Sequence, residues 1–270
     1  MGIYVNGNNV GLVNEAPDPK FKNLIDGSLT EITAEDLNGL SSIRQGAFYY
    51  LSLTSITIPT SVTSIGAYAF YYCSRLERVT FDGTSQCTSI GDSAFRGSSS
   101  LTSITIPSSV TSISQSAFYN CSSLTSITIP SSVTSLGSEV FYNCTDLETV
   151  TFEEPSPLTT LNSSTFRGCS NLTNITLPNG IRSIGFFCFM NCSSLISITI
   201  PSSVTSIYSS VFDGCSSLTT MIIKATNPPT LSSTLPDTLQ TIYIPAGTLG
   251  AYQSANNWSR YANKFVEMEV

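Results

Sequence analysis

Cysteine thiols are the side chains whose type and spacing most readily suggest chemistry in this chain. Six of the eight cysteines lie three residues after a recurring phenylalanine, at Cys73, Cys121, Cys144, Cys169, Cys192 and Cys215. Such a series could form metal sites or a disulfide framework, but the sequence has no histidine and no Cys-x-x-Cys pair to favour zinc. We expect a buried row of reduced thiols, because equivalent side chains of a repeat point in parallel and do not meet disulfide geometry. Cys87 and Cys188 lie outside this row and are expected to be the more reactive thiols.

The composition excludes the common catalytic relays. Without histidine the chain can form neither a Ser-His-Asp nor a Cys-His relay, and it lacks the usual general base near neutral pH. The adjacent acids Glu153 and Glu154 fall on a predicted exposed loop with no partner base. With 11 Lys and Arg and a net charge of −7, the chain has too few cations to neutralise a run of phosphates. We therefore predict a protein that is not an enzyme, uses no cofactor or metal and binds no nucleic acid.

Hydroxyl groups must form most of the surface of this 270-residue chain. Only 11% of the residues are charged, whereas 79 are serine or threonine, and an average soluble protein has about 25% charged residues. A hydrophobic fraction of 41% is too high for a disordered stalk, and the apolar stretches are too short to span a membrane. The chain begins Met1-Gly2-Ile3-Tyr4, with no basic segment before an apolar one, so we expect no secretory signal peptide.

A repeat of about 23 residues organises the chain. A phenylalanine, usually preceded by alanine, recurs at spacings of 22 to 25 residues. Its positions are Phe48, Phe70, Phe95, Phe118, Phe141, Phe166, Phe189 and Phe212. A fixed period of this length predicts a solenoid, in which a coil buries its apolar face only by stacking on its neighbours.

The coil at residues 124–146 shows the pattern most clearly. Apolar residues alternate with hydroxyl residues along 124–129, which predicts a short parallel strand ended by Pro130. Residues 133–136 predict a second short strand, and residues 140–141 a short helical or 3₁₀ turn in the core. Two positions after the phenylalanine, six of the eight coils carry asparagine or glycine, which tolerate a positive φ and favour a tight left-handed turn.

Both ends of a solenoid need caps. We assign residues 1–28 to an N-terminal cap made of a hairpin and a linker, since residues 3–8 contain an Asn-Gly hairpin signal. Residues 29–245 form the solenoid of eight to nine coils, and Thr33–Asp36 resembles a capping box that opens a short helix. Residues 246–270 lose the repeat and predict an amphipathic helical cap over the last coil.

The repeat LTSITIPSSVTSIxxxAFYNCSS closely resembles the BspA-like class of bacterial leucine-rich repeats, over residues 29–245. The ending at residues 242–262 is also similar to the closing segment of such proteins. The resemblance implies a leucine-rich-repeat solenoid with short parallel β-strands on its concave face, second short strands and 3₁₀ or helical turns elsewhere, and caps at both ends. It further implies a non-enzymatic, adhesin-like recognition module exposed on bacteria or carried by their phages, and it transfers no defined site.

Two surfaces of such a solenoid could bind a partner. The first is the concave face, formed by the outward strand positions, together with a rim of three longer loops at residues 82–86, 153–157 and 224–229 that recur every third coil. We expect ligand-binding residues there at Arg78, Thr80, Asp82, Glu148, Thr149, Glu153, Glu154 and Lys224. The second is an edge with tyrosines one residue after the core phenylalanine, at Tyr71, Tyr119 and Tyr142. Arg96 and Arg167 occupy the same position in other coils and are expected to interrupt this platform.

The expected partner is a protein or a glycan on a host or neighbouring cell, bound without membrane insertion, at an extracellular, cell-surface or virion location. One alternative is a structural spacer, or a component of a virion or surface layer that binds no small ligand. A remote alternative is ice binding by the ladder of outward hydroxyls, although threonine is also simply a good strand former whose hydroxyl keeps the face soluble.

Overall fold

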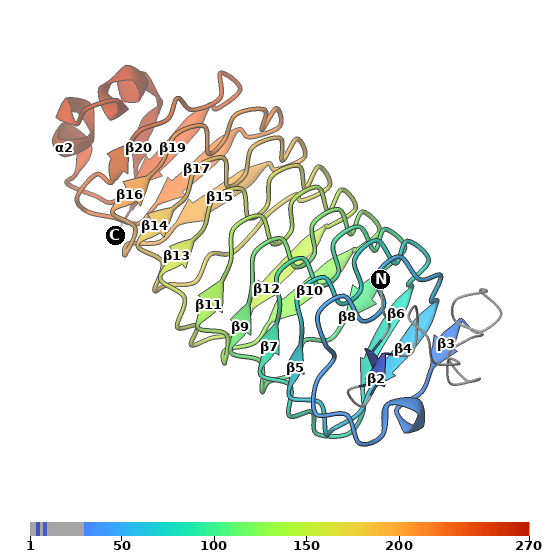
Figure 1. The fold of residues 1–270 in the computed structure, drawn as a ribbon. Coiled ribbons are helices and arrows are strands. Elements are labelled where there is room, and N and C mark those ends of the chain that lie inside the picture. The colour runs from blue at the N-terminus through green and yellow to red at the C-terminus, as the bar shows by residue number, and fades with distance from the viewer. Residues whose placement is uncertain (1–3, 6–7, 10–29, 270) are drawn as a thin grey trace.

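Stacked coils of similar size make up the fold. The computed structural model describes residues 4–5, 8–9 and 30–269, and the chain winds into a parallel-strand solenoid of about ten turns (Figure 1). The expected leucine-rich-repeat solenoid is confirmed. The number of turns exceeds eight to nine because the segments at residues 31–32 and 265–267 also add strands to the concave face.

Two rows of parallel strands run along the solenoid. The concave face consists of β3 (Glu31–Ile32), β4 (Ser55–Ile58), β6 (Arg78–Phe81), β8 (Ser103–Ile104), β10 (Ser126–Ile129), β12 (Thr149–Phe152), β15 (Ser197–Ile200), β17 (Thr220–Ile223), β19 (Thr241–Ile244) and β20 (Phe265–Glu267). The second row consists of β5 (Ser64–Ile65), β7 (Ser89–Ile90), β9 (Ser112–Ile113), β11 (Ser135–Leu136), β13 (Thr160–Leu161), β14 (Ser183–Ile184), β16 (Ser206–Ile207) and β18 (Thr230–Leu231). Figure 1 shows both rows following the axis of the stack.

Neighbouring strands of the concave face pair in register, but the ladder is interrupted twice. Ser126 pairs with Thr149 and Ile129 with Phe152, so hydroxyl residues align outside and apolar residues inside. The strands nevertheless fall into the groups β3-β4-β6-β8, β10-β12 and β15-β17-β19-β20. The interruptions lie beside β8 and beside residues 174–177, the two segments that follow the first two long loops. Because these loops carry extra residues after the strand, the next coil diverges at that end.

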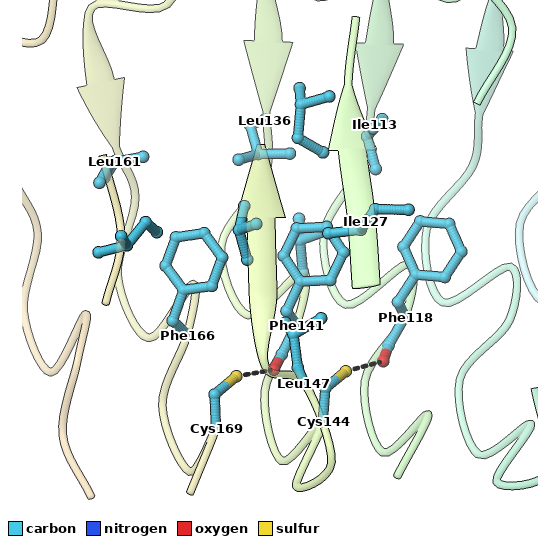
Figure 2. Close-up of a cluster of buried hydrophobic side chains, with 14 of the residues drawn as sticks. Ile113, Phe118, Ile127, Leu136, Phe141, Cys144, Leu147, Leu161, Phe166 and Cys169 are labelled. Carbon is cyan, nitrogen blue, oxygen red and sulfur yellow. Dashed lines mark hydrogen bonds between the residues drawn. The ribbon is translucent and has the colours of Figure 1, made fainter. Parts of the chain in front are cut away.

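The phenylalanine column forms the centre of the core, as expected. All eight rings are buried. Successive rings stack with centroids 4.9 to 5.9 Å apart and interplanar angles of 3 to 14°. Figure 2 shows three of them, Phe118, Phe141 and Phe166, among the leucines and isoleucines of the strands. Each ring therefore packs against equivalent rings above and below, which couples every coil to both neighbours.

The turn around each phenylalanine is a series of i→i+3 turns. Tyr119 N donates to Ser116 O and Cys121 N to Phe118 O, while Asn120 N donates to Tyr142 O of the following coil. Asn120 has φ of 56°, which confirms the predicted left-handed position. Ser116, two residues before the phenylalanine, has φ of 55° as well, and this position of positive φ recurs in every coil.

The N-terminal prediction is only partly covered by the described residues. β1 (Tyr4–Val5) and β2 (Asn8–Asn9) pair antiparallel, as the hairpin signal predicts; the rest of residues 1–28 lies outside the described residues. The predicted capping box is present: Thr33 N donates to Asp36 Oδ2 at 2.8 Å and Asp36 N to Thr33 Oγ1 at 3.4 Å. These bonds join Thr33 to Asp36, the second residue of η1 (Glu35–Leu37).

The C-terminal cap combines helices with a final strand. α2 (Leu249–Ser254) and η2 (Trp258–Lys264) match the predicted helical tail, whereas β20, which pairs in parallel with β19, was not predicted. Tyr252 and Trp258 are fully buried, and Trp258 Nε1 donates to Pro229 O at 2.7 Å. The apolar core is thereby closed at this end. No helix among the described residues is long and apolar enough to cross a bilayer.

Candidate functional site

The row of six thiols links neighbouring coils inside the core. Cys144 Sγ donates to Phe118 O at 3.2 Å and Cys169 Sγ to Phe141 O at 3.1 Å, as Figure 2 shows. The other four repeat this bond to the preceding coil, and Ser98 Oγ makes it to Phe70 O at 3.0 Å in one of the two coils that lack the cysteine. Burial raises the pKa of the Cys215 thiol to about 12. The row therefore holds protonated, structural thiols.

Cys87 and Cys188, the two thiols expected to be more reactive than the row, also lie in the core. Both side chains are fully buried. Burial raises the pKa of Cys188 to about 12 and also raises the pKa of Cys87. A thiol becomes reactive through exposure and a lowered pKa. Among the described residues, no cluster of Cys, Asp and Glu could hold a metal ion.

Many hydroxyl groups outside the concave face hold the coils together. Thr111 Oγ1 donates to Thr88 O at 3.2 Å, and Thr134 Oγ1 donates to Thr111 O at 3.1 Å. Serines and threonines at three other positions of the repeat make the same kind of bond to the backbone of the preceding coil. A substantial share of the serines and threonines is thus structural.

The outward hydroxyls of the concave strands behave differently. Ser103, Thr105, Ser126 and Thr128 are exposed. None of these four hydroxyls takes part in a side-chain hydrogen bond within the part of the chain that the structure describes. Since a hydroxyl offers one donor and two acceptor sites, this face keeps its hydrogen-bonding capacity for water or for a partner.

A hollow of 600 Å³ opens on the concave face beside the first long loop. β6 pairs with β8 only through Arg78–Ser103 and Val79–Ile104, so the two strands separate beyond these residues. The polar lining comprises Arg78, Thr80, Thr84, Ser85, Ser103, Thr105 and Ser108, and Phe81 and Pro107 add apolar surface. We call this feature the concave hollow. It offers one cation, several hydroxyls and an apolar patch, a combination that can fix the orientation of a ligand.

The predicted ligand-binding residues are all exposed, but the structure does not bring them into one site. Arg78 and Thr80 line the concave hollow, and Asp82 opens the loop beside it. The residues Glu148, Thr149, Glu153 and Glu154 lie three coils further along, and Lys224 three coils beyond those. The equivalent backbone bonds Asp82 N to Ile58 O, Glu153 N to Ile129 O and Lys224 N to Ile200 O show that the loops begin alike.

Sequence reasoning missed the residues that complete the concave hollow. Ser103, Thr105 and Ser108 belong to the coil after the long loop, whose sequence is nearly identical to that of ordinary coils. The sequence feature that could have pointed to the hollow is loop 82–86, because its extra residues change how the following strand, β8, pairs with β6.

One part of the tyrosine edge, from Arg96 to Arg167, is a stack that includes the arginines. Tyr119 and Tyr142 stack with centroids 4.4 Å apart. The Arg96 guanidinium lies 3.9 Å from the centroid of the Tyr119 ring, and that of Arg167 lies 5.3 Å from that of Tyr142. The two arginines therefore extend the Tyr119–Tyr142 stack at its ends, since a planar guanidinium stacks on an aromatic face. No ring contact among the described residues joins Arg96 to Tyr71, so the tyrosine row is interrupted there, as expected. Tyr71 belongs to a separate cluster, in which it stacks on Tyr49 at 4.8 Å.

The repeat identifies the family. A model of the BspA type leucine rich repeat region matches residues 41–156 and 152–250, in six copies. The chain belongs to the BspA-type leucine-rich-repeat family. No curated protein sequence matches this BspA-type chain.

Solved structures of bacterial leucine-rich repeat proteins share the BspA-type solenoid. One from Bacteroides ovatus is 31% identical with a TM-score of 0.57, and the match covers 73% of this chain and 57% of the B. ovatus chain. The T. pallidum protein TpLRR is also 31% identical, with a TM-score of 0.54, and the match covers 62% of this chain and 78% of TpLRR. A protein from Eubacterium ventriosum is 26% identical with a TM-score of 0.51, covering 75% and 60% respectively. The chain thus spans little more than half of the B. ovatus protein.

Proposed function

We propose that this BspA-type protein is a non-catalytic recognition module that binds a protein or a glycan through its concave face, with the concave hollow as the centre of contact. The observation that carries the proposal is the contrast between the hydroxyl groups. At four other positions of the repeat, serines and threonines bond the coils to one another, whereas Ser103 and Thr105 are exposed without an intramolecular side-chain bond and line the hollow.

Charge supports the same centre. Ordinary coils carry mostly serine and threonine outward, and a uniform surface cannot distinguish one register of a partner from the next. Arg78 is the cation of the concave hollow, and Asp82 lies at the rim beside it. Charges at such positions fix the orientation and register of a partner more than they add affinity. The acids Glu148 and Glu153 would extend the contact along the rim.

Two other functions have less support. A structural spacer would make use of the coil-to-coil bonds, but it gives no role to the free hydroxyls of the concave face. Ice binding needs a regular hydroxyl array, and the ladder of this face is interrupted beside β8 and beside residues 174–177.

The test is a screen on arrays of glycans and of extracellular proteins, followed by binding measurements with two variants. Thr105→Arg places a long side chain in the concave hollow, while Thr199→Arg puts it at the same strand position four coils away, outside the proposed contact. We expect Thr105→Arg to weaken binding at least tenfold and Thr199→Arg to change it less than threefold. Equal binding by both variants refutes the central role of the hollow. Absence of any partner on both arrays favours the spacer.

Exposure outside the cell, on a bacterial surface or a virion, is part of the proposal, because recognition of a host or neighbouring cell requires it. Burial of all eight cysteines fits an oxidising environment, since buried protonated thiols resist oxidation. Cleavage of the protein on intact cells or particles by an added protease tests this location.

A further inference from the structure

A second hollow opens on the edge of the solenoid, just after the core phenylalanines. It has a volume of 490 Å³ and is lined by Tyr72, Gly97, Asn120 and Asn143, which hold the same position in four successive coils, and by the hydroxyl residue two positions later in each coil. We call it the edge groove. It shares no lining residue with the concave hollow.

We propose that the edge groove binds a linear, uncharged oligosaccharide that runs along the solenoid axis. Tyr72 supplies the aromatic wall at one end. Its ring stacks on Tyr50 at 5.4 Å on one side, and on the other side Gly97 has no side chain to cover the outer part of the ring. A Cβ atom at residue 97 would lie 2.9 Å from the ring, so glycine is required there. The exposed part of an aromatic ring offers an apolar surface to the C–H face of a sugar.

The amides of the edge groove are free to bind hydroxyl groups. Within the described residues, the Asn120 and Asn143 side chains make no hydrogen bond of their own. An amide carries both donors and an acceptor, which suits neighbouring hydroxyls of a sugar ring. The adjacent hydroxyl groups, in contrast, are held in one orientation by hydrogen bonds to the preceding coil. Ser122 Oγ donates to Ser99 O at 3.4 Å, and Thr145 Oγ1 donates to Ser122 O at 3.3 Å. Their oxygen atoms therefore remain available as acceptors.

Charge and spacing determine the class of ligand. None of the residues that line the edge groove is charged, so an acidic or basic ligand would lose hydration there without gaining a counter-charge. Equivalent rings on this edge lie 5.4 Å apart at Tyr50–Tyr72 and 4.4 Å apart at Tyr119–Tyr142. This period is close to the length of one sugar residue in an extended chain, so each coil presents its polar groups to one sugar.

The experiment uses substitutions that the repeat itself contains. Tyr72→Asn places an asparagine in one coil and leaves Gly97 at the equivalent position of the next coil, the arrangement already found at Asn143 and Gly168. Asn143→Gly introduces glycine, which other coils carry at this position of positive φ. Asn191→Gly is the matched control, since this asparagine occupies the same position outside the edge groove. The probes are cellohexaose, xylohexaose, mannohexaose and chitohexaose, with oligogalacturonate as the acidic comparison, measured by titration calorimetry.

We expect at least one neutral hexaose to bind the wild type and the acidic oligomer to bind more weakly. Tyr72→Asn should weaken binding about tenfold and Asn143→Gly about 2- to 12-fold, with Asn191→Gly unchanged. Binding of no neutral hexaose, preference for the acidic oligomer, or equal losses in all three variants overturns the proposal. Thr105→Arg should leave this binding intact, so the edge groove and the concave hollow are tested independently.

Discussion

Truncation of Phe141 tests whether the ring stack couples the coils. The Phe141 ring is fully buried between Phe118 and Phe166, with centroids 5.6 Å away on both sides and interplanar angles of 7 and 8°. No neighbouring side chain can fill the space, because each coil supplies one ring to its own level. Phe141→Ala should therefore cost about 3 to 5 kcal/mol through lost burial and the cavity left behind. For a chain of this size, that loss lowers the melting temperature by roughly 6 to 20 °C.

Calorimetry and hydrogen exchange measure this effect. Exchange should accelerate in the coils of Phe118 and Phe166 as well as in that of Phe141, because stability in a solenoid depends on nearest-neighbour contacts. Phe186→Ala is the control, since that ring is 43% exposed and should contribute less than about 0.5 kcal/mol. A melting temperature equal to that of the wild type, or faster exchange confined to a single coil, would show that the stack does not couple the coils.

Three further predictions follow from the thiols and the loops. Alkylation of all eight cysteines should be slow in the folded protein and complete after unfolding; a disulfide-linked peptide joining Cys121 to Cys144 would contradict the reduced row. The free energy of unfolding should decrease as the pH rises above about 8.5, because thiols of the unfolded chain ionise there while burial holds the pKa of Cys73 and Cys188 in the folded protein at about 12. Urea titrations under reducing conditions measure this free energy, and no dependence on pH between about 8 and 11 would refute the prediction. Shortening loops 82–86 and 153–157 to the proline-led connection of the other coils should preserve folding, as judged by circular dichroism, because five coils already use that connection; loss of the cooperative transition would show that the loops are structural.

The sequence predicted the features that repeat. Alternation of apolar and hydroxyl residues defined the strands, and the spacing of phenylalanines such as Phe141 identified the core stack. Asparagine and glycine two residues later marked one position of positive φ, because these residues tolerate it. The corresponding position before the phenylalanine carries residues such as Tyr68, Glu139 and Phe187, which do not favour a positive φ. Its conformation is instead set by backbone bonds to the next coil, such as Tyr68 N to Asp92 O.

The candidate sites were less predictable because they depend on how one coil meets the next. The concave hollow arises from pairing that is lost between β6 and β8, and no residue of β8 differs in type from an ordinary coil. The stacking of Arg96 on Tyr119 likewise depends on alignment between coils. In the sequence the two arginines looked like interruptions of the tyrosine edge, and only their positions in space show that they extend the Tyr119–Tyr142 stack.

A uniform stack of coils is stable because every level repeats the same bonds, and for that reason it presents the same surface at every level. Recognition needs a place where one level differs from the next. In this chain loop 82–86 provides that difference, since β6 continues into a longer connection and β8 pairs with it through only two residues. The missing pairing removes little of the core, because the Phe95 and Phe118 rings of these two coils still stack at 5.3 Å. The core thus holds the coils together while the outer ends of the strands separate, and the site forms on the surface with little disturbance of the coupling beneath it.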